Sequence, residues 1–263
     1  MTRIITGDGT SIACRITGAN DAPVLILGNS LGTDMRLFDP QVEALARRFR
    51  VVRFDMRGHG RSGAPAGDYS IARLGQDVLD LADALDIERF AFAGVSLGGM
   101  VGQWLGVRAA ERLRALALCN TSAFMRPPEA WQARIAAVCA DGMAAMADAV
   151  GERWFTPAFR ASHPDVVAHA LAMLRATPAS GYAGCCAAIR DMDQRGAVRA
   201  ITVPVLVIAG RDDPATPLPH AGQLVHAIPN ARLAVLDAAH LSNLERPAEF
   251  TQLLAGFLED AIR

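Results

Sequence analysis

The sequence has no lysine, and all 26 of its positively charged side chains are arginine. Schiff-base chemistry and phosphate binding by a P-loop both require a lysine, so a pyridoxal-phosphate enzyme and a Walker-type ATPase are excluded. Hydrophobic residues make up 51% of the 263 residues and charged residues 20%, which is typical of a globular protein. The length suits one domain with an insertion.

Other features are missing as well. The formal net charge is −1 and there is no basic run, so nucleic-acid binding is not expected. None of the 5 cysteines shows CxxC spacing, which favours reduced structural thiols and no metal site. No apolar run reaches the length of a signal peptide or a membrane span. We therefore expect a cytoplasmic protein without membrane partners. The sequence leaves open whether the protein forms a homo-oligomer.

Short apolar runs alternate with helical patterns along most of the chain. Several runs are continuously apolar, which is typical of strands buried on both faces of a parallel sheet. The alternation predicts an α/β fold, with a mostly parallel sheet and helices on both faces. The first two apolar runs are expected to form an antiparallel opening of the sheet, ahead of its parallel part. The predicted strands are Ile12–Thr17, Val24–Gly28, Arg50–Asp55, Phe90–Gly94, Ala115–Asn120, Val205–Ala209 and Arg232–Leu236, and the predicted helices are Ile71–Leu85, Leu97–Ala109, Leu218–Ala227 and Pro247–Ala261.

One region breaks this alternation. Residues 122–200 contain alanine-rich helical patterns interrupted by proline and glycine, and no convincing strand. This predicts a core formed by residues 1–121 and 201–263, with residues 122–200 inserted as a helical lid over the carboxyl edge of the sheet.

The stretch Gly94-Val-Ser96-Leu-Gly98 fits the G-x-S-x-G pattern of a nucleophile elbow. Glycines are needed there because a strand turns sharply into a helix around the serine, whose hydroxyl then projects outward. The pattern alone is weak evidence for a nucleophile elbow in a chain with 23 glycines, but a predicted buried strand precedes it and a predicted helix follows. Ser96 is therefore the candidate nucleophile, and a plain loop serine is the alternative.

A serine hydroxyl needs a base and an orienting acid to become a nucleophile. In this class of fold they follow the serine in the order acid, then histidine. His240 stands just beyond the last predicted strand and is the candidate base. Asp213, which follows the strand before it, is the candidate acid, with Asp212 as the alternative.

An oxyanion hole needs two amide donors, and losing one typically costs about 100-fold or more in rate. The first candidate is the N–H of Leu97, the residue after the nucleophile. The second is the N–H of Leu31, in the loop after an earlier strand. Ser30 beside it is a second hydroxyl without an evident role.

Two further patterns are rejected. Gly58-His-Gly-Arg-Ser-Gly63 matches the dinucleotide fingerprint G-x-G-x-x-G, yet the chain continues as a loop where that motif opens a helix. Cys119 lies near a strand end, but no elbow surrounds it. We expect no metal ion or organic cofactor.

Taken together, these motifs resemble the α/β-hydrolase superfamily, and longer stretches resemble one family in it, the 3-oxoadipate enol-lactonases. The resemblance covers nearly the whole chain, and its stretches in the insertion are the most specific. The matching stretches are Asn29–Asp34, Asp39–Gln41, Arg53–Ser62, Leu118–Thr121, Arg153–Pro157, Gly181–Arg190 and Ala239–Asn243.

The resemblance implies a Ser96–Asp213–His240 triad that hydrolyses a small anionic enol-lactone in the catabolism of aromatic compounds. An arginine must bind the substrate carboxylate because lysine is absent, and Arg134 and Arg190 are the candidates. Trp154 could line the pocket. Phe38 stands where many members have tryptophan and could supply an aromatic wall.

Three other functions remain open from the sequence. One is a general carboxylesterase, or a hydrolase of another ring-cleavage product with the same triad. Another is a ligand-binding protein on a hydrolase scaffold, which would bind without turnover. The third is a cofactor-free peroxidase side activity.

Overall fold

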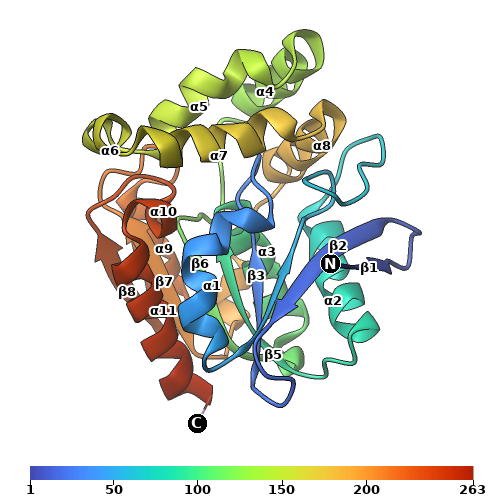
Figure 1. The fold of residues 1–263 in the computed structure, drawn as a ribbon, viewed down its shortest axis with the longest axis vertical. Helices are drawn as coiled ribbons and strands as arrows, with labels where there is room; N and C mark the ends of the chain where they lie inside the picture. The colour runs from blue at the N-terminus through green and yellow to red at the C-terminus, as the bar shows by residue number, and fades with distance from the viewer. Residues whose placement is uncertain (263) are drawn as a thin grey trace.

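A computed structural model describes residues 1–262. Its centre is an 8-stranded sheet in the order β1-β2-β4-β3-β5-β6-β7-β8 (Figure 1). Strands β3 to β8 pair in parallel, while β2 runs antiparallel to both of its neighbours. The predicted α/β class with a mostly parallel sheet is confirmed. The strands are β1 (Thr2–Ile5), β2 (Ser11–Thr17), β3 (Val24–Gly28), β4 (Arg50–Phe54), β5 (Phe90–Val95), β6 (Leu113–Cys119), β7 (Val205–Gly210) and β8 (Ala231–Leu236).

The start of the sheet differs from the prediction. All seven predicted strands are present, but β1 was not predicted, because only Ile4 of its four residues is buried. The antiparallel opening consists of β1 and β2. The second predicted run, β3, instead lies in the parallel part between β4 and β5, so that expectation was wrong for β3.

Helices cover both faces of this sheet. On one face α1 packs beside α11, and on the other α2 packs beside α3 (Figure 1). Strands β5 and β7 are buried along their whole length between these layers. The four predicted helices are present, whereas α1 and α10 were not predicted. The helices around the sheet are α1 (Asp39–Ala46), α2 (Ile71–Ala84), α3 (Leu97–Arg108), α9 (Leu218–Ala227), α10 (Ser242–Glu245) and α11 (Pro247–Ile262).

A group of five helices lies between β6 and β7 in the chain and sits above the core in Figure 1. Three of them begin with a proline at the first helical position, where the missing N–H costs nothing. The prolines that interrupt the sequence pattern therefore mark helix starts. The helices are α4 (Pro128–Asp141), α5 (Ala147–Trp154), α6 (Pro157–Ser162), α7 (Pro164–Ala176) and α8 (Ala179–Arg190). The limits 122–200 for this lid remain a prediction.

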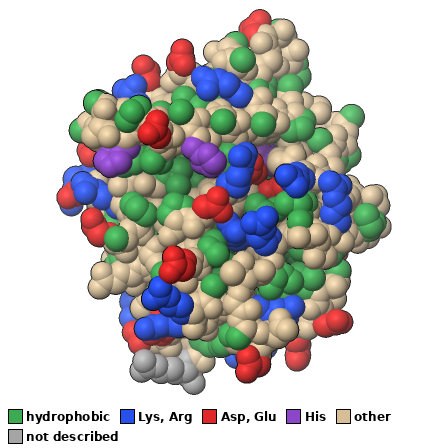
Figure 2. Space-filling model, viewed as in Figure 1, with side chains coloured by type: hydrophobic (Ala, Val, Ile, Leu, Met, Phe, Trp, Pro, Cys, Tyr) green, Lys and Arg blue, Asp and Glu red, His purple; other side chains and the backbone are tan. Residues whose placement is uncertain are grey.

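The surface agrees with the balanced composition. On the face drawn in Figure 2, basic and acidic side chains are interspersed. Among the residues that the structure describes, no helix has the length and apolar character needed to cross a membrane.

Candidate active site

Ser96 lies at the sharp turn between β5 and α3. Its φ of 55° falls in the left-handed region, which non-glycine residues seldom adopt and which stores strain. Three hydrogen bonds hold its backbone there. Its N–H donates to the Cys119 carbonyl at 2.8 Å, and its carbonyl accepts from Thr121 Oγ1 at 2.7 Å and from the Met100 N–H at 3.0 Å. The hydroxyl is thus presented on a rigid turn.

The glycines on either side are required by backbone contacts. A Cβ on Gly98 would lie 2.2 Å from the Gly28 carbonyl oxygen. A Cβ on Gly94 would lie 2.2 Å from the carbonyl carbon of Gly98. Backbone atoms cannot turn aside as a flexible side chain can, so the G-x-S-x-G pattern reflects close packing of strand, turn and helix.

Gly98→Ala should therefore lower the free energy of unfolding by about 1–3 kcal/mol, the usual cost of overpacking. Gly222→Ala is the matched control, because nothing lies within 4 Å of the position of a Cβ on this helical glycine. Thermal and urea unfolding of both variants would measure the effect. Equal stability of the two variants would contradict this description of the turn.

His240 and Asp213 come together behind the serine. His240 follows β8, and its Nδ1–H donates to Asp213 Oδ2 at 2.9 Å. Asp213 follows β7 and also accepts hydrogen bonds from the N–H groups of Ala215 and Thr216, from Thr216 Oγ1 and from Asn120 Nδ2, at 2.7 to 3.1 Å. With a buried carboxylate fixed by five donors, the imidazole has one tautomer available, with Nε2 unprotonated.

The electrostatics of Asp213 fit this arrangement. Burial by itself would raise the pKa of the carboxyl group, but His240 and the hydrogen bonds from Thr216 outweigh burial and lower the pKa to about 2. Asp213 is therefore ionised at neutral pH and can stabilise a positive charge on His240.

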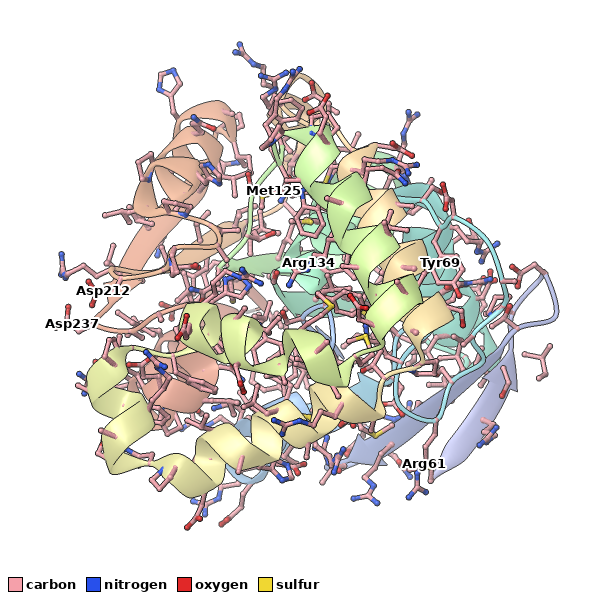
Figure 3. The ribbon with its side chains drawn as sticks, turned by 90° about the horizontal axis from the view of Figure 1, so that it is seen from above. Arg61, Tyr69, Met125, Arg134, Asp212 and Asp237 are labelled. Atoms are coloured by element: carbon pink, nitrogen blue, oxygen red, sulfur yellow. The ribbon has the colours of Figure 1, made fainter. Side chains whose placement is uncertain are left out.

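The other aspartates nearby do not reach His240. Asp212 is exposed, and Asp237 is exposed and pairs with Arg211 at 2.7 Å. Figure 3 shows Asp212 and Asp237 at the edge of the molecule, away from Arg134 near the middle of the view. The structure thus brings Asp213, and not Asp212, to the histidine.

Ser96 and His240 both line a cavity of about 50 Å³ between the core and the inserted helices. Within residues 1–262, no hydrogen bond joins Ser96 Oγ to His240. Such bonds are often long in free enzymes and shorten when substrate binds. The cavity is lined by Ser30, Leu31, Ser96, Met100, Met125, Trp131, Arg134, Val150, Arg153, Trp154, Tyr182, Ile189, Ala215, Thr216 and His240.

Two backbone donors lie beside Ser96. Leu31 lines the cavity from the loop after β3, and Leu97 is the first residue of α3. In the described part of the chain, neither N–H donates a hydrogen bond to another residue. The amino end of α3 adds the favourable end of a helix dipole. These two groups are available to stabilise an oxyanion.

Two arginines from the insertion line the same cavity. Arg134 lies over the rings of Trp131 and Tyr182, with its Cζ 5.4 and 5.5 Å from the ring centroids. Its buried Nε has no hydrogen-bond partner among residues 1–262. Burial and the neighbouring Arg134 lower the pKa of Arg153. Within that range neither guanidinium lies within 4.0 Å of a carboxylate, so neither arginine of the cavity is held in an ion pair.

The substrate-binding expectations have mixed outcomes. Trp154 lines the cavity beside Arg134, as expected. Arg190 does not, because it ends α8 on the outside, where it pairs with Asp68 and Asp191 and donates to Gln132. Phe38 does not either; it is fully buried in the core at the end of a short turn, η1 (Met35–Phe38).

Some residues of the site were missed in the sequence. Asn120 and Thr216 fix Asp213, and Asn120 carried a usable signal because it is the polar last residue of the predicted strand Ala115–Asn120. Arg153 and Tyr182 lie in stretches that resemble the enol-lactonases and Trp131 does not, but a helix pattern does not show which inserted residues turn toward the serine.

A larger cavity, of about 410 Å³, lies elsewhere on the surface and lacks this chemistry. Its charged lining residues partly pair with one another, as Arg36 does with Asp34 and Arg53 with Asp39. Figure 3 shows Arg61 of this cavity at the periphery, well apart from Arg134. We therefore place the active site in the smaller cavity.

Comparison with known proteins agrees with this geometry. Residues 23–247 match the family model described as alpha/beta hydrolase fold. The chain belongs to the alpha/beta hydrolase family. It is 37% identical over 256 residues to 3-oxoadipate enol-lactonase 1 of Acinetobacter baylyi, covering 97% of this chain and 96% of that protein.

Solved structures extend the likeness. The enol-lactonase from Burkholderia xenovorans LB400 is 43% identical, with a TM-score of 0.96, covering 98% of this chain and 100% of that one. A hydrolase from Pseudomonas aeruginosa PA01 is 46% identical, with a TM-score of 0.96, covering 98% and 97%. The predicted resemblance to 3-oxoadipate enol-lactonases is confirmed, and the predicted class of ester-hydrolysing enzyme agrees with it.

Proposed function

We propose that this protein hydrolyses 3-oxoadipate enol-lactone to 3-oxoadipate in the catabolism of aromatic compounds. The observation that carries the substrate class is the pair Arg134 and Arg153, two cations without a carboxylate partner in the cavity that holds Ser96 and His240. The names of the enol-lactonase relatives support the specific lactone. We place the reaction in the cytoplasm and propose no metal or organic cofactor.

The acylation step uses Ser96, His240 and Asp213. Ser96 Oγ attacks the lactone carbonyl while His240 Nε2 takes the hydroxyl proton, and ionised Asp213 stabilises the resulting imidazolium. The N–H groups of Leu31 and Leu97 stabilise the negative oxygen of the tetrahedral intermediate. When it collapses, the ring C–O bond breaks and His240 returns the proton to the departing enol oxygen.

The leaving group of a lactone stays attached to its acyl group, so the acyl-enzyme contains every atom of the substrate. Water then attacks the Ser96 ester, with His240 as general base, and the serine hydroxyl is regenerated. The enol product tautomerises to the ketone in solution.

Arg134 is proposed to bind the substrate carboxylate, with Arg153 beside it. A planar guanidinium matches a carboxylate with two parallel hydrogen bonds, and its stacking on Trp131 and Tyr182 keeps it in place. Because residues of the insertion, Arg134 and Arg153 among them, form one wall of the cavity that holds Ser96, we assign residues 122–200 the role of a lid.

Arg134→Gln should raise KM for the enol-lactone by about 10- to 100-fold, the usual value of a hydrogen bond to a charged group. Hydrolysis of neutral p-nitrophenyl acetate should change little. Arg190→Gln is the matched control and should leave both reactions near wild type. Steady-state kinetics on the two substrates would measure this, and equal losses on both would rule out a carboxylate-binding role.

The function itself is tested by comparing kcat/KM for the enol-lactone with that for neutral p-nitrophenyl esters. A clear preference for the lactone is expected. Turnover of the ester with an inert lactone would instead favour a general carboxylesterase. Stoichiometric binding without turnover of either would favour a ligand-binding protein.

A further inference from the structure

The oxyanion loop, residues 29–34, is buried and pinned at nearly every peptide. The Asn29 carbonyl accepts from the Gly98 N–H at 2.9 Å, and its side-chain amide donates to the Phe54 carbonyl at 2.7 Å. The Ser30 carbonyl accepts from both the N–H and the hydroxyl of Thr33, at 3.1 and 2.8 Å. These bonds fix the peptide that carries the Leu31 N–H.

The next peptide is held by a side chain from outside the loop. The Gly32 N–H donates to His59 Nε2 at 2.9 Å. On the other side of the ring, Nδ1 lies 3.1 Å from the Arg57 carbonyl oxygen and donates to it. Because Nδ1 carries the proton, Nε2 is the acceptor that the Gly32 N–H requires.

His59 is itself held rigidly. Its side chain is fully buried, its N–H donates to the Met56 carbonyl at 2.9 Å, and its carbonyl accepts from the Ser62 N–H at 3.0 Å. Burial lowers the pKa of the imidazole to about 4, so the ring is neutral at the pH where ester hydrolysis runs.

The glycines beside His59 explain how the ring reaches the loop. Gly58 has a φ of +81°, and a Cβ there would lie 2.6 Å from the Cα of Gly181 in α8. Gly60 has a φ of +53°, and a Cβ there would lie 2.4 Å from the carboxyl carbon of Asp55. Only a glycine on each side lets the turn fit between α8 and Asp55. The G-x-G-x-x-G stretch thus has a structural use unrelated to dinucleotides.

We propose that His59 is a positioning residue for the oxyanion hole, because its Nε2 fixes the Gly32 peptide and so sets the direction of the neighbouring Leu31 N–H. Leu31 is then held from both sides, by Thr33 through Ser30 and by His59 through Gly32. A donor aimed in advance at the developing negative charge needs no reorganisation during reaction. A misplacement of about 1 Å can cost about 100-fold in rate.

The test compares His59→Gln with His59→Asn. Glutamine can place its amide oxygen near the position of Nε2 and accept from Gly32, whereas asparagine keeps a donor for the Arg57 carbonyl but is too short to reach Gly32. Active sites are counted with a p-nitrophenyl phosphonate, so that misfolded protein does not enter kcat. The substrate is p-nitrophenyl acetate, which is independent of carboxylate recognition.

For His59→Asn we expect kcat per titrated site to fall about 10- to 100-fold with little change in KM, and affinity for phenylboronic acid to fall in parallel. His59→Gln should keep most of the wild-type kcat and most of the wild-type affinity for phenylboronic acid. Equal kcat in the two variants, or a loss explained entirely by fewer titrated sites, would overturn the proposal.

This inference rests on the proposed serine mechanism, and the two can fail separately. If Ser96→Ala kept wild-type ester hydrolysis, the serine mechanism would fall. If Ser96→Ala were inactive while the Gln and Asn variants behaved alike, only the role of His59 would fall.

Discussion

Replacing Ser96 with alanine is expected to lower kcat for ester and lactone hydrolysis by about 100,000-fold or more, because His240 then has no hydroxyl at position 96 to activate. The substitution removes one oxygen atom and leaves the turn intact, since the backbone bonds to Cys119, Thr121 and Met100 involve no side-chain atom of residue 96. Rates would be measured at substrate saturation, with unfolding curves to confirm the fold.

A matched control is available in the neighbouring loop. Ser30 lines the same cavity and is the other serine in it. Ser30→Ala should lose far less activity than Ser96→Ala. If the Ser30 variant were the inactive one, the assignment of the nucleophile would be wrong.

Asp213→Asn is expected to lower kcat by about 10,000-fold, because a neutral amide neither stabilises the imidazolium nor requires the proton on His240 Nδ1. The pKa of about 2 means that wild-type Asp213 is ionised throughout the pH range in which ester hydrolysis would be assayed. Asp212→Asn, one residue away and exposed, should keep near-wild-type kcat.

Kinetics of the two variants between pH 5 and 9 would separate these roles. A large loss in the Asp212 variant, or near-wild-type activity in the Asp213 variant, would contradict the triad. Because the two substitutions are chemically identical and adjacent, a general disturbance of the loop would affect both alike.

The positions of the candidate triad residues could be predicted from the sequence because each residue belongs to a local sequence pattern. Gly94 and Gly98 mark the elbow, Asp213 follows the buried strand β7, and His240 follows the edge strand β8. In a parallel sheet the carboxyl ends of strands meet at one edge, so residues far apart in the chain are brought together by topology alone. The choice between Asp212 and Asp213 required the structure, since both follow the same strand.

The substrate end of the cavity could not be predicted in this way. Arg134, Arg153 and Arg190 all lie on inserted helices whose patterns look alike, and their direction depends on how these helices pack on each other. Arg190 turned out to pair with Asp68 on the outside, and Arg153 was not among the arginines predicted to bind the carboxylate. Short β1 was missed for a related reason. Only Ile4 of its four residues is buried, and the strand exists because it pairs with β2, which its own residues do not show.

The most direct test of the account is rapid acid quenching of the enzyme during turnover of 3-oxoadipate enol-lactone, followed by mass spectrometry of the protein and its peptides. We predict a transient adduct on the peptide that contains Ser96, with a mass gain equal to the whole lactone because its leaving group stays tethered. The adduct should be absent in Ser96→Ala. Rapid turnover of the lactone with no adduct at Ser96, or with an adduct on another residue, would contradict the mechanism.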